Sequence, residues 1–512
     1  MVEKFFWADQ IAEQIIKEKG NKMQRISSSH RSSKSQTKEY VCASGITPSG
    51  IVHIGNFREV ITTELVVRAL KDRGKKVRFI YSWDDFDRFR KVPTNVPKSF
   101  EKYIGMPVSD VPSPDGKGSY AEHFEKTFEK SLVKVGIKPE FIKQHLMNKK
   151  CVYASLIKKA IEKRKEIMDI LNKYRKEPLK ENWWPFAVYC EKCKKDSTKI
   201  ISAERYFIEY ECACGHKEKF DYRKKGIVSV KWRVDWPMRW KYEEVDFEPG
   251  GIDHSVEGGS YTTAKEISKK IYDWEPPIYQ FYDWVTIKGI PLKDFHSSKG
   301  SVMTLDEVEE IYEPEVLRYL FASTKPRSGF EISFDNDVIK VYNEYDELEL
   351  KYYSNKADNK EKRIYEMSQI KLSEKKPLRK NFRHLISFVQ TGKLKGLNET
   401  SKKRAEKVRN WLKKYAGEDM KFIVQDKIKI KLSGSEKKAM IALKEFLNSG
   451  KKTEDEIFNG FYEICKSVGI ENKDFFNTAY NIIIGKVRGP RLASLIIEIG
   501  QDKVVKLLGK IK

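Results

Sequence analysis

Hydrophobic and polar positions between residues 39 and 83 follow a strand–helix–strand order. The runs EYVCASGI and KKVRFIYSW both have the apolar, β-branched composition of a buried strand. Between them, in NFREVITTELVVRALKDRG, apolar residues recur at helical spacing, at Phe57, Ile61, Leu65 and Ala69. Because parallel strands need a crossover helix, this order predicts one βαβ unit of a parallel sheet in an α/β fold.

The rest of the chain changes character several times. We expect an amphipathic helix in 1–20, a serine-rich, basic, flexible insertion in 21–38, loop in 91–120, helix in 121–175, short strands around a cysteine cluster in 183–230, strands and turns in 232–300, and charged helices beyond about 340.

Charge and cysteine usage narrow the choice of partner and compartment. Lys and Arg number 99 against 74 Asp and Glu, and this net charge of +25 predicts a polyanionic partner, of which nucleic acid is the favoured kind. A salt-adapted or lysine-rich proteome is the alternative explanation of this excess. No apolar run is long enough to span a bilayer, so we expect no membrane partner. Four of the seven cysteines cluster, which favours a reducing, cytoplasmic setting over a disulfide framework.

The stretch Pro48–Asn56, PSGIVHIGN, leads from the first strand into the predicted helix. Gly50 and Gly55 would let the backbone turn sharply, and the helix N-terminus behind them is an anion site. His53 and Asn56 would add donors there, which suits the phosphates of a nucleotide. An ordinary strand-to-helix turn with a capping Asn is the alternative.

A second polar loop, His296–Thr304, carries one lysine in HSSKGSVMT. Lys299 could reach a phosphate as a mobile point charge, and Ser297 and Ser298 add hydroxyl donors. A plain surface loop is the alternative.

Together the two loops resemble the signatures of class I aminoacyl-tRNA synthetases. HIGN in this chain corresponds to the family's His-Ile-Gly-His motif, and SSKG corresponds to its Lys-Met-Ser-Lys-Ser loop. Further segments look like the archaeal-type class I lysyl-tRNA synthetases: FWADQIAEQI, ASGITPSGIVHIGNFREV, YSWDDFDRFRKVP, KWRVDWPMRW, DHSVEGGSY, PEVLRYLFASTKP and GKVRGPRL. The resemblance covers nearly the whole chain outside 21–38.

The resemblance implies a Rossmann-type parallel-sheet catalytic domain, a zinc-bearing insertion and a C-terminal all-helical domain. The expected divisions are 1–110 (N-terminal helix and first half of the catalytic domain), 111–230 (insertion with the zinc cluster), 231–300 (second half, with the SSKG loop), 301–345 (stem-contact region) and 346–512 (helical anticodon-binding domain).

The implied activity is ATP-dependent activation of L-lysine to lysyl-adenylate and transfer to the 2′-hydroxyl of the terminal adenosine of tRNA(Lys), by a monomer with Mg²⁺ bound to the ATP. By similarity His53, Asn56 and Lys299 are catalytic. The expected ATP-binding residues are Pro48, Gly50, His53, Gly55, Asn56, Ser297, Ser298 and Lys299.

The expected lysine pocket combines matched family positions with acids chosen on chemical grounds. The matched positions are Gly45, Thr47, Trp232, His254 and Tyr282. An ammonium also needs a carboxylate, and Asp84, Asp85 and Asp253 are the candidates, Asp253 for the amino group or a ribose hydroxyl. N-capping of a following helix is the alternative for Asp84 and Asp85.

Two departures from the family pattern stand out. Asp294 and Phe295 occupy the positions of the usual first loop lysine and the methionine, with Lys293 one residue away. Where relatives often carry a Cys-His pair before the SYAEHF helix, this chain has Lys117 and Gly118, so we expect no metal site there, although His123 remains.

The cysteine cluster is Cys190-x-x-Cys193 followed by Cys212-x-Cys214. Two cysteine pairs on two turns suit a structural, tetrahedral Zn²⁺ site, in which His216 could replace one sulfur of the tighter pair. Four unrelated thiols are the alternative.

The basic tail should be a helical bundle whose aromatics are mostly core. We expect Arg488 and Arg491 of GKVRGPR to contact tRNA, where unstacked anticodon bases could meet an Arg plane. A class I synthetase specific for Glu, Arg or Cys, or a non-catalytic tRNA-binding paralogue, remains an alternative function.

Overall fold

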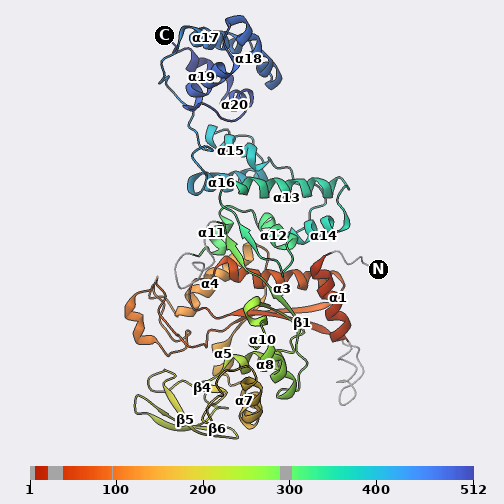
Figure 1. Ribbon diagram of the computed structural model, residues 1–512, viewed down its shortest axis with the longest axis vertical. Coiled ribbons are helices and arrows are strands. Elements are labelled where there is room, and N and C mark those ends of the chain that lie inside the picture. The colour runs from red at the N-terminus through yellow and green to blue at the C-terminus, as the bar shows by residue number, and fades with distance from the viewer. Residues whose placement is uncertain (1–5, 21–37, 95, 289–301, 512) are drawn as a thin grey trace. The chain divides into compact units, whose positions relative to one another are not determined.

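The computed structural model describes residues 6–20, 38–94, 96–288 and 302–511. The chain divides into two compact units (Figure 1). The first comprises Met1–Glu309, Pro314–Ile332 and Ala357–Leu372, and the second Glu310–Glu313, Ser333–Lys356 and Ser373–Lys512. The flexible insertion expected in 21–38 lies outside the described residues except for Lys38.

The first unit is built on a five-stranded, wholly parallel sheet. Its order is β10-β9-β1-β2-β3. The strands are β1 (Glu39–Ile46), β2 (Lys76–Trp83), β3 (Glu140–Lys143), β9 (Phe247–Gly251) and β10 (Ile278–Tyr282). The chain adds β2 and β3 on one side of β1 and later adds β9 and β10 on the other. The strand order therefore reverses between β1 and β9, where such sheets bind ligands.

The predicted βαβ unit is confirmed. Strands β1 and β2 pair in parallel from Glu39 with Lys76 to Ile46 with Trp83, and α3 (Ile54–Asp72) connects them. The apolar face expected of this helix is fully buried. α3 also packs on α1 (Trp7–Lys19), as the red and orange ribbons of Figure 1 show.

Two expectations about the sheet region were wrong. Residues 121–175 are not helical throughout, because β3 interrupts them; this edge strand of four residues is too short and too polar to give a clear pattern. The described part of residues 232–300 contains three helices besides strands: α8 (Trp232–Glu243), the short α9 (Ile252–Ser255) and α10 (Ser260–Lys270). Pro237 within α8 and the glycines before α10 masked them.

The remaining elements of the first unit surround this sheet or form an insertion. The helices are η2 (Lys98–Tyr103), α4 (Tyr120–Lys134), α5 (Gln144–Lys149), α6 (Ala154–Glu162), α7 (Arg164–Asn172), α9 (Ile252–Ser255), α11 (Leu305–Glu309), α12 (Pro314–Ser323) and α14 (Asn359–Ser368). The strands are β4 (Phe186–Val188), β5 (Thr198–Glu204), β6 (Phe207–Cys212), β7 (Lys217–Asp221), β8 (Val228–Val230), β11 (Val285–Ile287) and β12 (Phe330–Ile332).

The second unit is helical, as expected. Its helices are α13 (Asp337–Tyr353), α15 (Phe382–Thr391), α16 (Glu399–Lys414), α17 (Gly434–Asn448), α18 (Glu454–Val468), α19 (Asn472–Ile484), α20 (Leu492–Ile499) and α21 (Gln501–Leu508). The expected boundary at 345/346 falls inside α13. Phe382 and Phe461 are buried core residues. Among the residues described, no helix combines the length and apolarity needed to cross a membrane.

Candidate active site at the carboxyl ends of the parallel strands

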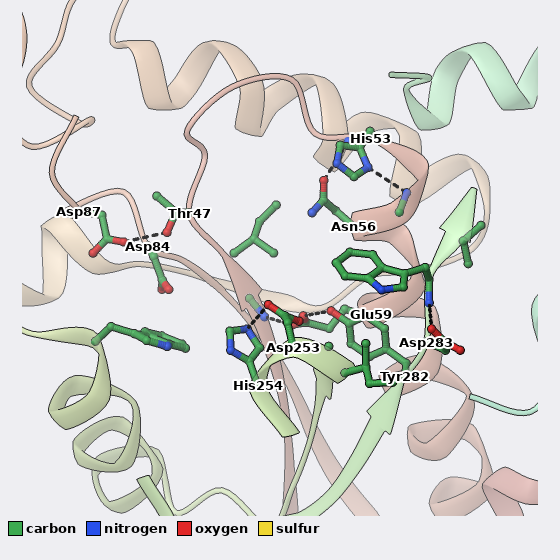
Figure 2. Close-up of a pocket in the computed structure, with 18 of the residues that line it drawn as sticks. Thr47, His53, Asn56, Glu59, Asp84, Asp87, Asp253, His254, Tyr282 and Asp283 are labelled. Atoms are coloured by element: carbon green, nitrogen blue, oxygen red, sulfur yellow. Dashed lines mark hydrogen bonds and ion pairs between the residues drawn. The ribbon is translucent and has the colours of Figure 1, made fainter. Parts of the chain in front are cut away.

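A cavity of about 410 Å³ lies where the strand order reverses. Its walls include the last residues of β1, β9 and β10 and the turn after β2 (Figure 2). The lining contains ten of the predicted site residues: Gly45, Thr47, His53, Gly55, Asn56, Asp84, Trp232, Asp253, His254 and Tyr282. Residues far apart in sequence thus converge on one site, and their functional roles stay predictions.

The N-terminus of α3 forms one end of the cavity. His53 is the N-cap residue: its Nδ1 accepts a hydrogen bond from the backbone N–H of Gly55 at 3.0 Å. The side-chain oxygen of Asn56 in turn accepts a hydrogen bond from the backbone N–H of His53 at 3.1 Å, which completes a reciprocal capping box. Because Nδ1 is the acceptor, the ring proton belongs on Nε2, which leaves His53 with an N–H donor beside the positive end of the helix.

The second polar loop returns to this turn. The backbone N–H of Ile54 donates to the carbonyl of Met303 at 2.8 Å, and His53 forms an isolated antiparallel bridge with Thr304. Ser297, Ser298 and Lys299 themselves lie outside the described residues, as does Asp294. The chain that carries them re-enters the described structure against the His53 turn.

Glu59, one helical turn beyond Asn56, was missed by sequence reasoning. Its two carboxyl oxygens accept from the N–H of Gly45 at 2.8 Å and from the hydroxyl of Tyr282 at 2.8 Å. Burial raises its pKa to about 8. Near pH 7 Glu59 is therefore mostly neutral, and it joins α3, β1 and β10 at the cavity floor.

Asp84 is bound by an internal cation. Arg239 of α8, which is buried, donates to Asp84 at 2.6 and 3.3 Å and pairs with Asp235 at 2.9 Å. Asp84 also accepts from the hydroxyl of Ser82 at 3.1 Å. This carboxylate is neutralised by the protein, and it caps no helix.

Asp87 is a carboxylate that can still accept a hydrogen bond from a ligand. Its Oδ2 accepts from the hydroxyl of Thr47 at 2.8 Å, and its Oδ1 has no partner among the residues described. Burial raises its pKa to about 6, with the neighbouring charge of Asp84 adding to the rise. Figure 2 shows Asp84 and Asp87 together at the end of the cavity away from His53 and Asn56.

Aromatic side chains make another wall. Trp232 lines the cavity and stacks on Trp236 with ring centroids 5.0 Å apart. His254 lies next to both rings and 3.9 Å from a carboxylate oxygen of Asp253. A flat apolar surface beside carboxylates suits a ligand with an aliphatic stem and a cationic end.

Several predicted residues lie elsewhere, and Asp85 needs correction. Its side chain is fully buried, accepts from the backbone N–H of His145 at 2.7 Å and pairs with the His145 ring, so it cannot meet a ligand in the cavity. Pro48 and Gly50 are buried in the turn and do not line the cavity. Neither Gly50 nor Gly55 has a positive φ, so backbone conformation does not by itself require glycine at these positions.

The sequence held signals for the missed residues. Glu59 follows Asn56 by three positions and so shares its helix face. Asp87 belongs to the same acidic run as Asp84.

Gly45, a predicted residue, is needed for packing, since a Cβ there would lie 2.4 Å from the carbonyl oxygen of Ser82.

The four clustered cysteines of the insertion come together. The Sγ atoms of Cys190 and Cys214 are 3.7 Å apart, those of Cys193 and Cys212 are 3.6 Å apart, and all four lie within 4.8 Å of one another. A tetrahedron with metal–sulfur bonds of ~2.3 Å has edges of about 3.8 Å. The thiols therefore fit a four-sulfur metal site without His216.

Comparisons with known proteins match most of the chain to one family, and the relatives cover nearly its full length. The family model described as tRNA synthetases class I (K) matches residues 5–371. The chain is similar to the lysine–tRNA ligase of Borrelia garinii subsp. bavariensis, with 44% identity over 98% of this chain and 99% of that protein. The lysine–tRNA ligase of Pyrococcus horikoshii is 40% identical over the same shares.

A solved structure supports the fold. A glutamate tRNA ligase from Elizabethkingia meningosepticum, in complex with its amino acid, superposes with a TM-score of 0.50. It covers 93% of this chain and 99% of its own, at 13% identity.

Proposed function

The chain belongs to the class I tRNA synthetases of the lysine type, and from that premise we propose that it ligates lysine to tRNA(Lys). The observation that carries the proposal is the cavity in which a helix N-terminus with two polar caps faces a group of carboxylates and an aromatic wall. The end of the cavity at the helix N-terminus suits phosphates, and the end with the carboxylates suits an amine. An arginine-rich pocket, as a glutamate substrate would need, is not what this lining offers.

The proposed reaction has two steps. A carboxylate oxygen of lysine attacks the α-phosphorus of ATP, and the bond to pyrophosphate breaks, giving lysyl-adenylate. The terminal 2′-hydroxyl of tRNA then attacks the lysyl carbonyl, and AMP leaves. Positioning and charge stabilisation dominate such transfers. Mg²⁺ would enter with the ATP phosphates.

His53 and Asn56 would hold the ATP phosphates. The Nε2–H of His53 is a preorganised donor beside the positive end of the α3 dipole, because the capping box fixes the ring before any ligand binds. The first N–H groups of α3 are themselves paired, with the carbonyl of Met303 and with His53. Lys299 stands four residues before Met303, which is anchored to the α3 turn. Four fully extended residues span at most roughly 14 Å, so this is the greatest distance between the two backbone positions. Lys299 is our candidate for stabilising the departing pyrophosphate.

Asp87 would receive the side-chain ammonium of lysine. Glu59 is mostly neutral at pH 7 with both oxygens occupied, Asp84 is paired with Arg239, and Asp253 is more than half exposed. Asp87 keeps an open oxygen and is held in place by Thr47. Trp232 would pack against the aliphatic stem.

The four-cysteine cluster would bind Zn²⁺ with a structural role. Four protein ligands leave no open position for chemistry. The ion would join the turn at Cys190 and Cys193 to the turn after β6, and so stiffen the insertion.

The second unit would bind tRNA. Arg488 and Arg491 are exposed in the segment between α19 and α20, where side chains can reach RNA. The net charge of +25 supports this partner. A cytoplasmic, translational role is proposed from the family to which the chain belongs.

Aminoacylation of total tRNA, with ATP, Mg²⁺ and each labelled amino acid in turn, tests the function. We expect charging by lysine only. Charging by Glu, Arg or Cys would keep the fold and refute the pocket assignment, whereas tight tRNA binding without charging would indicate the non-catalytic paralogue.

Two substitutions of His53 separate its cap from its donor. His53→Ala removes both, and should lower kcat roughly 100-fold or more and helix stability by about 1 kcal/mol. His53→Asp keeps a good N-cap acceptor but offers no hydrogen-bond donor, so kcat should fall with the melting temperature preserved. If His53→Asp retains wild-type kcat, the role of His53 is structural only.

Asp87→Asn should raise the KM for lysine about 10- to 100-fold at pH 8, because a hydrogen bond to a charged group contributes ~1.5–3 kcal/mol. In the wild type, KM should rise as the pH falls through about 6, since protonation removes the charge of Asp87. The variant should lose this pH dependence. Asp115→Asn, on an exposed loop, is the matched control. An unchanged KM in Asp87→Asn would refute the assignment.

Elemental analysis of the purified protein should find about one Zn per chain, reduced strongly in Cys212→Ser and unchanged in Cys151→Ser, which lies outside the cluster. A chelator should lower the melting temperature of the wild type. A metal content that Cys212→Ser leaves intact would contradict the site.

A further inference from the structure

Glu59 is a buried carboxyl group at the floor of the cavity, and the proposed reaction gives it no part. It lines the cavity and is only 8% exposed. One of its oxygens accepts from the backbone N–H of Gly45 and the other from the hydroxyl of Tyr282, both at 2.8 Å. Any effect of Glu59 on a ligand therefore passes through these two partners, and Tyr282 is the one whose hydrogen bond can reverse its direction.

The surroundings of Glu59 make its negative charge costly in the free protein. The ionisable groups that face it are phenols and acids: Tyr81 of β2, Asp84 after β2, Glu248 of β9, and Tyr279 and Tyr282 of β10. The buried cation of this region, Arg239, is already paired with Asp84 and Asp235. A buried carboxyl group without a counterion keeps its proton, and burial accordingly raises the pKa of Glu59 to about 8.

The protonation state of Glu59 decides what the Tyr282 hydroxyl offers to a ligand. An ionised Glu59 can only accept, so the hydroxyl donates to it and the phenol oxygen remains an acceptor toward the cavity. A neutral Glu59 can instead donate its own proton to that oxygen, which frees the phenol proton and makes the hydroxyl a donor. An ammonium group has donors and no lone pair, so it fits only the ionised state.

The Tyr282 hydroxyl borders a space that a side chain would otherwise fill. A Cβ on Gly251, at the end of β9, would lie 3.7 Å from the Tyr282 hydroxyl oxygen and 2.4 Å from Oδ1 of Asp253. Glu59, Tyr282 and Asp253 lie together in Figure 2, and all three line the cavity. A phenol oxygen and a carboxylate beside the same small space suit a group with several N–H donors.

The charge of lysine matches this arrangement. At neutral pH the amino acid carries two ammonium groups. Asp87, with one open oxygen, is the proposed partner of the side-chain ammonium. The other ammonium needs acceptors of its own, and the Tyr282 hydroxyl backed by an ionised Glu59 supplies one beside Asp253.

We propose that Glu59 gives up its proton when lysine binds, and that the resulting carboxylate holds the Tyr282 hydroxyl so that its oxygen accepts a hydrogen bond from an ammonium group of the amino acid. The proton passes to solvent, and the new negative charge offsets the ammonium through Tyr282. Glu59 is thus a positioning residue. The inference rests on the proposed function for the identity of the amino acid, and because Asp87 is assigned the side-chain ammonium, the α-ammonium is the group expected at Tyr282.

The first test counts protons. L-Lysine is titrated into the full chain by isothermal titration calorimetry at pH 7, in buffers of different ionisation enthalpy. We expect release of about one proton per lysine, because a carboxyl group with a pKa of about 8 is about 90% protonated at pH 7, whereas Asp87, with a pKa of about 6, contributes only about a tenth. Glu59→Gln, which keeps an acceptor for Gly45 but cannot ionise, should leave only that tenth.

Glu125→Gln is the matched control. Glu125 of α4 is also a buried carboxyl group, and burial raises its pKa to about 7, but it does not line the cavity. This variant should release protons as the wild type does. Equal proton release in the wild type and in Glu59→Gln would overturn the proposal, as would a release that Glu125→Gln abolishes equally.

The affinity for lysine gives a second readout. In the wild type, Kd should fall about fivefold from pH 7 to pH 8, since the proton that binding displaces is progressively lost from the free protein. Glu59→Gln should lose this dependence and bind lysine at least fivefold more weakly than the wild type at pH 8, with its melting temperature preserved. Tyr282→Phe should weaken binding as well, and the double variant should be no weaker than the weaker single variant. Additive losses would refute action through Tyr282.

Two analogues identify the ammonium group. Norleucine keeps only the α-ammonium and 6-aminohexanoate only the side-chain ammonium, and we expect the proton release with norleucine alone. Release with 6-aminohexanoate alone would keep the role of Glu59 and contradict the assignment of Asp87. Equal release with both would mean that neither ammonium is responsible, and would overturn the proposal.

Failure of the proposed function is distinguishable from failure of this inference. If the chain charges tRNA with another amino acid, the proposed function is wrong. The same proton count with that amino acid still tests Glu59, because every α-amino acid carries an ammonium group.

Discussion

The buried guanidinium of Arg239 is the constraint on which the candidate site depends. A charge removed from water must be paired, and Arg239 of α8 finds Asp84 at the end of β2 and Asp235 on its own helix. The pairing holds α8, and with it the Trp232 wall, against the sheet. It also neutralises Asp84, so the open carboxylate in that turn is Asp87.

The N-terminus of α3 shows one set of atoms with a structural and a candidate chemical use. Capping satisfies backbone N–H groups that every helix start leaves unpaired. Here a histidine does so through Nδ1, which fixes the proton on Nε2. Capping of α3 therefore also places a hydrogen-bond donor at the cavity, where the strand order reverses. Glu59 joins α3, β1 and β10 at the same place.

The distribution of charge separates two kinds of ligand. Among the charged residues that line the cavity of the first unit, five are acids and one, Arg90, is a cation, whereas a hollow in the second unit, lined by residues of α16 and the end of α19, has six cations and one acid. A net charge of +25 does not distinguish these environments. Local field, set by which side chains face each hollow, is what would select an amine in one and a phosphate backbone in the other.

The sequence by itself determined the βαβ unit, the helical tail, the four-cysteine cluster and the family, because these depend on short-range periodicity and on motifs of contiguous residues. Only the tertiary structure decided among the acids. Asp84, Asp85 and Asp87 are neighbours in one run, but Arg239, His145 and Thr47, distant in sequence, give them different partners. Folding brings these partners together, and the partners decide which carboxyl group is paired and which can reach a ligand. No local sequence pattern encodes such long-range contacts.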